Sequence, residues 1–299
     1  IDQLQVAGRG RRAGPAMTAG EALRDAEARL GQAGVDSPQA DAEWLMADLL
    51  SCSRSELPLF TDTALSVDQQ TRLATRVERR FRREPLHHIL GTAHFFGYEF
   101  QVTGDVLIPR PETERLVELA VAFLESLPHP SVHDLGTGSG CMAVALAKRC
   151  PKANVIASDL SEAALRLAKR NAEVLGAFGQ VAFRHADGLD ALAKGEQVDL
   201  ILSNPPYIPS GEIDALQPEV RDHDPCLALD GGPDGLRFYR MLAAEGRSRL
   251  NRGGRLMAEF GDGQEQSVAK LFREANWLDV EIADDLSGRP RIVIASAGQ

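Results

Sequence analysis

The stretch Ser131-Val132-His133-Asp134-Leu135-Gly136-Thr137-Gly138-Ser139-Gly140 decides the fold, because it leads straight into the apolar run from Cys141 to Arg149. A short β-branched run, a glycine loop and a helical run in that order predict a strand–loop–helix unit of an α/β protein. Glycines permit positive φ and close approach of the backbone, and free N–H groups at a helix start attract anionic groups. The spacing is G-x-G-x-G, which differs from the dinucleotide pattern G-x-G-x-x-G. We therefore expect a ligand cradle of another kind.

An acidic residue supports this interpretation. The strand predicted at residues 154–158 ends in Asp159, about 20 residues beyond the glycines, where a carboxylate accepts hydrogen bonds from ribose hydroxyls. A third strand, residues 180–185, ends at Ala186-Asp187-Gly188. Ligands of open α/β sheets bind just beyond the carboxyl ends of the strands.

The apolar run from Val198 to Ser203 ends in Asn204-Pro205-Pro206-Tyr207. The prolines carry no N–H, so this turn presents mainly carbonyl acceptors on a stiff backbone, with an aromatic ring beside them. Such a corner suits a planar NH2 group, either an amide or an exocyclic amine. The alternative is an ordinary turn that ends a strand, with a core tyrosine.

Together these motifs resemble class I methyltransferases that use S-adenosylmethionine. The resemblance narrows to the HemK/PrmC family of release factor glutamine methyltransferases. It rests further on Leu107-Ile108-Pro109-Arg110-Pro111-Glu112-Thr113-Glu114, Glu84-Pro85-Leu86 before Ile89-Leu90-Gly91, and Leu286-Ser287-Gly288-Arg289-Pro290-Arg291. It runs from about Met17 to the C-terminus.

The resemblance implies methyl transfer from S-adenosylmethionine, leaving S-adenosylhomocysteine, to the side-chain amide of a glutamine in the Gly-Gly-Gln motif of class I release factors. The implied catalytic residues are Asn204, Pro205, Pro206 and Tyr207. The implied cofactor-binding residues are Gly136, Thr137, Gly138, Ser139, Gly140, Asp159, Asp187, Gly188 and Asn204. Arg110 and Glu112 are candidates for the architecture of the site, and no metal is expected.

The expected fold is α/β: a mixed, Rossmann-like sheet of about seven strands with helices on both faces, preceded by a helical bundle and a β-hairpin linker. We expect a disordered extension at residues 1–16, a substrate-recognition bundle at 17–90, the hairpin at 91–108 and the methyltransferase domain at 109–299. Within the hairpin segment, the alternation over residues 94–102 and the Gly104-Asp105 turn place the second strand at residues 106–108.

Composition bounds the function further. A formal net charge of −10 argues against a large nucleic-acid footprint, and the scattered cysteines, Cys52, Cys141, Cys150 and Cys226, indicate neither a disulfide framework nor a zinc site. No apolar run is long enough for a membrane span. We therefore expect a cytoplasmic monomer with no direct nucleic-acid site.

Three questions stay open from sequence. The helix over residues 72–83 is rich in arginine, which favours either a solvated face or a docking face for an acidic partner. A methyltransferase for a ribosomal-protein glutamine shares every motif. An adenine-N(6) nucleic-acid methyltransferase uses the same tetrapeptide on a flipped base, although the negative charge disfavours it.

Overall fold

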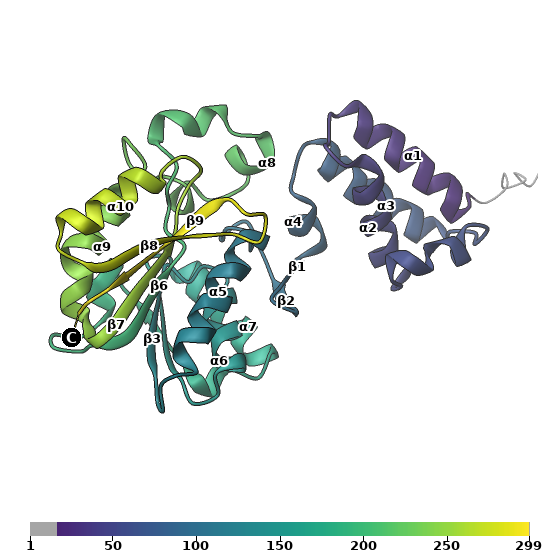
Figure 1. Cartoon of the computed structure of the whole chain (residues 1–299). Helices are drawn as coiled ribbons and strands as arrows, with labels where there is room; N and C mark the ends of the chain where they lie inside the picture. The colour runs from purple at the N-terminus through teal and green to yellow at the C-terminus, as the bar shows by residue number, and fades with distance from the viewer. Residues whose placement is uncertain (1–16, 299) are drawn as a thin grey trace, which may run out of the picture. The chain divides into compact units, whose positions relative to one another are not determined.

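The computed structural model (Figure 1) describes residues 17–298. The described chain divides after Leu90 into two compact units, each with its own hydrophobic core. The prediction about residues 1–16 lies outside the described residues. Within residues 17–298, no helix is both long and apolar enough to cross a membrane.

The first unit is helical, as expected. Its elements are α1 (Ala19–Gln32), α2 (Pro38–Leu50), η1 (Arg54–Phe60), α3 (Val67–Phe81) and α4 (Leu86–Leu90). A reciprocal capping box starts α1, since Thr18 Oγ1 accepts from Glu21 N and the Glu21 carboxylate accepts from Thr18 N. Leu30, Leu45 and Leu73 bring the apolar stripes of α1, α2 and α3 into one core.

The arginines of α3 and of the turn after it are largely engaged within this unit. Arg76 pairs with Asp48 at 2.6 Å and Arg80 with Asp41 at 2.7 Å, both on α2. Further partners are Asp68 for Arg72, Glu84 for Arg79, Glu78 for Arg82, and the Gly34 carbonyl for Arg83. These contacts favour a structural role in joining the helices.

The second unit opens with the expected β-hairpin, but its turn lies earlier than predicted. Strands β1 (Thr92–Phe95) and β2 (Tyr98–Gln101) are antiparallel and joined by Phe96-Gly97. Both turn residues have positive φ, 52° and 80°, which matches the right-handed twist of paired strands. Residues 106–108 form no strand. The alternating pattern predicted the hairpin but not its turn, because Phe96 is an uncommon residue at positive φ.

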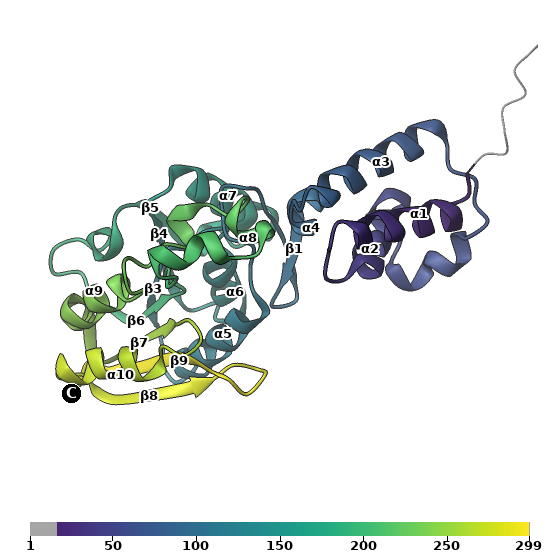
Figure 2. The same cartoon turned by 90° about the horizontal axis from the view of Figure 1, so that it is seen from above.

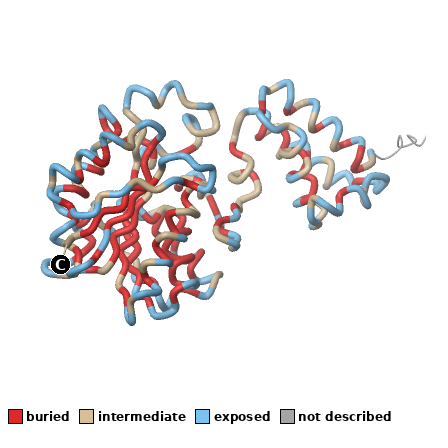
Figure 3. The backbone as a smooth tube through the Cα atoms, viewed as in Figure 1, coloured by how far each residue is buried: buried red, intermediate tan, exposed pale blue. Residues whose placement is uncertain are grey.

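The core of the second unit is a mixed seven-stranded sheet in the order β5-β4-β3-β6-β7-β9-β8, which confirms the predicted fold class. The strands are β3 (Ser131–Leu135), β4 (Asn154–Asp159), β5 (Val181–His185), β6 (Val198–Ser203), β7 (Leu250–Glu259), β8 (Leu278–Asp284) and β9 (Pro290–Ser296). β9 runs antiparallel to both of its neighbours, β7 and β8, and the other neighbouring pairs are parallel. The strands are nearly continuously buried at the centre of the sheet (Figure 3).

Helices cover both faces of the sheet (Figures 1 and 2). One face packs against α5 (Pro111–Leu124), α6 (Cys141–Arg149) and α7 (Glu162–Val174). The other face packs against α9 (Arg237–Glu245) and α10 (Glu265–Glu274). The remaining helices are short: η2 (Phe178–Gln180), η3 (Gly188–Ala191), η4 (Ser210–Ala215), α8 (Pro218–Arg221), η5 (Cys226–Ala228) and η6 (Gly246–Arg249).

Around β7, the local sequence pattern predicts a helix over residues 235–250 and a strand from Arg255, and both boundaries are wrong. Helix α9 ends at Glu245, and β7 begins at Leu250. Leu250 pairs with Val198 of β6, and the register then shifts before Leu200 pairs with Arg255. Backbone hydrogen bonds to β6 therefore extend the strand through Gly253-Gly254, where local propensity favours a turn.

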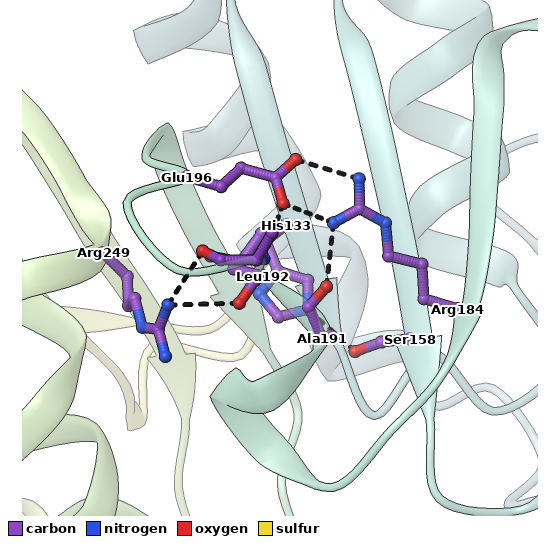
Figure 4. Close-up of polar contacts among 8 residues, drawn as sticks. His133, Ser158, Arg184, Ala191, Leu192, Glu196 and Arg249 are labelled. Atoms are coloured by element: carbon purple, nitrogen blue, oxygen red, sulfur yellow. Dashed lines mark hydrogen bonds and ion pairs between the residues drawn. The ribbon is translucent and has the colours of Figure 1, made fainter.

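A polar cluster lies where η3 and η6 approach the sheet (Figure 4). His133 on β3 is fully buried, and its Nε2 shares a hydrogen bond of 2.7 Å with Ser158 Oγ on β4. Nearby, Arg184 forms an ion pair with Glu196, and Arg249 donates to the carbonyls of Leu192 and Ala193. Burial lowers the pKa of His133 to about 4, so the ring is neutral near pH 7.

Candidate functional site

A cavity of about 410 Å³ lies at the carboxyl edge of the sheet in the second unit. Strand register explains its position. Leu135 pairs with Ser158 on one side and with Ser203 on the other, so β3, β4 and β6 end at the same level. Gly136 and Asn204, which follow β3 and β6, and Asp159, the last residue of β4, therefore meet around one opening, and all three line the cavity. Its volume is that of a small-molecule site.

The glycine loop forms one wall. Gly136, Gly138 and Gly140 have φ of 74°, 55° and 81°, a region that L side chains rarely adopt. A Cβ at Gly136 or Gly138 would meet no atom within 4 Å, which leaves this space to a ligand. A Cβ at Gly140 would lie 2.9 Å from Ala168 Cβ. Gly140 does not line the cavity; it allows α6 to pack closely on α7.

Two carboxylates hold the loop in place. Asp134 accepts from Thr137 Oγ1 at 2.6 Å and from Ala143 N at 3.1 Å, so it ties the loop to the start of α6. Burial raises the pKa of Asp134 to about 7. On the other side, Asp159 Oδ2 accepts from Gly138 N at 2.9 Å.

The other predicted cofactor-binding residues also line the cavity: Thr137, Ser139, Asp187 and Gly188. The second oxygen of Asp159 accepts from Ser161 N at 2.8 Å, which turns the chain into α7. Burial raises the pKa of Asp159 despite these backbone hydrogen bonds. Gly188 has φ of 51°, and a Cβ there would lie 3.2 Å from Met241 Cε. Glycine therefore lets this rim close against α9.

The four residues of the turn after β6 lie in two different environments. Asn204, Pro205 and Pro206 line the cavity. Tyr207 is not among its lining residues; the ring packs against the core cluster on the α9 and α10 face. Its carbonyl accepts from Gln264 Nε2 at 2.9 Å. Burial raises the pKa of Tyr207 to about 12, so its phenol is neutral. Of the two interpretations open from sequence, this geometry favours a tyrosine packed on the core over a ring that faces the ligand.

Of the two candidates for site architecture, Arg110 lines the cavity and Glu112 does not. Arg110 forms an ion pair of 3.0 Å with Asp224, whose carboxylate is buried. Burial raises the pKa of Asp224 to about 6, and the Arg110 guanidinium opposes that rise. This pair joins the segment before α5 to the long segment after Tyr207, and so fixes the rim of the cavity on that side.

Comparison with known proteins now bears on these features. Residues 21–91 match the PrmC N-terminal domain, and residues 117–222 match the Methyltransferase small domain. The Release factor glutamine methyltransferase of Geobacter sulfurreducens is 43% identical over 265 residues, which cover 88% of this chain and 91% of that protein. The protein of the same name from Cereibacter sphaeroides is 43% identical, covering 93% of this chain and 98% of its own length.

This chain belongs to the release factor glutamine methyltransferase family. Likeness to solved structures concerns its fold alone. A methyltransferase from Pyrococcus furiosus aligns with a TM-score of 0.50 at 17% identity, covering 78% of this chain and all of that one. The hMettl16 catalytic domain aligns with a TM-score of 0.52 at 15% identity, covering 78% of this chain and 82% of that one.

This family member has two residues beside its cavity that sequence reasoning did not single out. Thr113 lines the cavity from the first turn of α5, and Glu259 is buried at the end of β7. Glu259 lies near Asn204 because Ser203 pairs with Ala258, which brings the ends of β6 and β7 together. Thr113 reaches the same place from α5. A buried carboxylate at a strand end was the available signal, since such a group needs a partner.

Proposed function

We propose that this chain transfers a methyl group from S-adenosylmethionine to the side-chain amide nitrogen of a glutamine in peptide-chain release factors. One observation carries the proposal beyond family membership: the glycine loop and the Asn204-Pro205-Pro206 corner line the same cavity. A methyl donor held by the loop and an amide held by the corner would therefore meet inside it.

The residues present suit S-adenosylmethionine. Open space beside Gly136 and Gly138 accommodates a ligand against the backbone, and the Asp159 carboxylate is placed to accept from ribose hydroxyls. Asp187 and Gly188, at the next strand end, would border the adenine. When bound, this cofactor supplies a methyl group already activated by the sulfonium charge. The protein therefore needs to aim the acceptor rather than to activate the donor.

The acceptor is the harder half of the chemistry, because the lone pair of an amide nitrogen is delocalised into its carbonyl. We propose that Asn204 Oδ1 and the Pro205 carbonyl accept the two amide hydrogens. That grip would fix the direction of the nitrogen and stabilise the positive charge that develops on it. Directly after methyl transfer, the amide nitrogen carries a positive charge and is strongly acidic, so it would lose one proton to solvent without a general base and leave the neutral N-methyl amide. Tyr207 would stiffen the corner from behind.

The first unit, which matches the PrmC N-terminal domain, would bind the release factor outside the cavity. Because its α3 arginines are engaged with their own unit, we do not assign the docking to them. We propose that the protein acts as a monomer. Release factors act on ribosomes, and we propose the cytoplasm as the location.

The test is incubation of the purified protein with methyl-labelled S-adenosylmethionine and a class I release factor, followed by mass spectrometry of the peptides. We expect label on the glutamine of the Gly-Gly-Gln motif. A release factor in which this glutamine is replaced by glutamate should take up none. Label instead on a ribosomal-protein glutamine, or on adenine in supplied DNA or RNA, would overturn the assigned substrate.

A further inference from the structure

A hydrogen-bonded chain of buried side chains lies behind the catalytic corner. Thr113 Oγ1 donates to Glu259 Oε2 at 2.7 Å, and Asn204 Nδ2 donates to Thr113 Oγ1 at 3.1 Å. The three residues come from α5, β7 and the end of β6. Thr113 and Glu259 are both buried, so water does not substitute freely for either contact.

The number of protons available in this series of hydrogen bonds fixes which end of the Asn204 carboxamide faces Thr113. A hydroxyl has one proton to donate, and Thr113 gives it to the Glu259 carboxylate. What remains on the Thr113 oxygen are lone pairs, which accept only from the NH2 end of Asn204. The NH2 group therefore faces the protein, and Oδ1 is left as the acceptor on the other side of the carboxamide.

We propose that Thr113 and Glu259 are positioning residues that keep Asn204 oriented as a hydrogen-bond acceptor, and that this orientation makes the site select a carboxamide over a carboxylate. The inference rests on the proposed function, since it names the feature that discriminates the substrate. A glutamine amide offers two N–H donors to Asn204 Oδ1 and to the Pro205 carbonyl. A glutamate carboxylate would oppose the same oxygens with negative charge and no donor.

These hydrogen bonds hold Asn204 in this orientation only while Glu259 is ionised. A protonated Glu259 can donate to Thr113, which frees the Thr113 hydroxyl to donate to Asn204 Oδ1 and turns the amide around. Burial raises the pKa of Glu259 to about 7, whereas Thr113, Arg291 and Arg110 lower it and Glu112 raises it. Other ionisable groups packed around it are Tyr207 after β6 and Tyr239 on α9, whose hydroxyl donates to the Glu259 carbonyl.

Three variants of the full chain separate this role from a purely structural one. Thr113→Val removes the hydroxyl at nearly constant shape, Thr113→Ser keeps it, and Glu259→Gln removes the charge. Each is assayed with a release factor as substrate and with the same factor carrying glutamate in place of the glutamine as competitive inhibitor. Calorimetric titration with S-adenosylmethionine checks that the cavity is intact.

We expect Thr113→Val to lower kcat by about 10- to 100-fold, the range for loss of a preorganising hydrogen bond, while cofactor affinity stays within about threefold of wild type. The preference for the glutamine factor over the glutamate factor should narrow by about tenfold, and Thr113→Ser should restore both. We expect kcat of the wild type to decline below about pH 7, and this decline should flatten in Glu259→Gln.

Wild-type kcat and an unchanged glutamine-to-glutamate ratio in Thr113→Val would overturn the inference while leaving the proposed function intact. A decline of kcat at low pH that persists in Glu259→Gln would also contradict the inference. If instead the wild-type protein fails to methylate the glutamine at all, the proposed function itself is wrong. Should Thr113→Val lose cofactor binding, Thr113→Ser and Glu259→Gln still decide the matter.

Discussion

The backbone N–H of Gly138 donates to the Asp159 carboxylate at 2.9 Å, which joins two motifs that lie 21 residues apart in the chain. The glycine loop and the acidic residue are therefore one rigid element. With Ser161 N on its other oxygen, the carboxylate is fixed in direction before any ligand arrives. Such preorganisation reduces the entropy lost on binding.

Asp159→Ala should weaken binding of S-adenosylmethionine by roughly 1–3 kcal/mol, because charge-assisted hydrogen bonds to the ribose are lost and the loop loses its tether. Isothermal titration calorimetry measures this directly. Asp190→Ala is a matched control, since Asp190 is an exposed acid that does not line the cavity. Equal affinities in both variants and the wild type would contradict the assigned role.

Asn204→Ala should lower kcat by about 10²–10³, because it removes the side-chain acceptor that orients the amide and stabilises its developing charge. Cofactor affinity and the far-ultraviolet circular dichroism spectrum should be retained. Single-turnover assays with a release factor measure the chemical step itself. Near-normal turnover in a correctly folded variant would show that the corner does not grip the substrate.

Gly140→Ala should destabilise the second unit more than Gly253→Ala does. Both glycines have positive φ, 81° and 74°, so each alanine carries a backbone cost of roughly 1–2 kcal/mol. Only at Gly140 would the new Cβ lie 2.9 Å from Ala168, which adds about 1–3 kcal/mol of overpacking. Urea unfolding followed by tryptophan fluorescence compares the two. An equal loss would mean that α6 and α7 separate at little cost.

His133 should make the second unit sensitive to acid. Its pKa of about 4, depressed chiefly by burial from an ordinary 6.5, lies below that of the unfolded chain. Above pH 6.5 neither state binds the proton, and the contribution of the neutral ring to stability is complete. As the pH falls towards 4, His133 binds a proton in the unfolded chain but stays neutral in the folded protein. This difference lowers the free energy of unfolding by on the order of 3 kcal/mol.

The effect of His133 must be measured as a difference between the wild type and a variant. The raised pKa values of Asp134 and Glu259 make the free energy of unfolding change in the opposite direction over this pH range. Urea unfolding of wild type and His133→Gln between pH 4 and 7 should give curves that converge towards acid. Parallel curves would show that the pKa of His133 is not lowered in the folded protein.

Much of the fold followed from local patterns. The strand–loop–helix pattern at residues 131–149 and the apolar runs after it predicted the mixed sheet. Errors came where pairing outweighed propensity. Phe96 adopts positive φ because β1 and β2 pair around it, and β7 extends to Leu250 because β6 supplies hydrogen bonds there. Neither pairing register is visible in the local sequence.

By itself, the sequence determined the strand-end motifs, since a glycine loop, an acid and a proline-stiffened turn each follow an apolar run and therefore collect at one edge of a parallel sheet. It determined neither which side chains face the cavity nor what holds them. Only the tertiary structure showed that Tyr207 packs against the core and that Thr113 and Glu259 lie behind Asn204. The physical reason is that strand register and helix packing, not distance along the chain, decide which buried polar groups must satisfy one another.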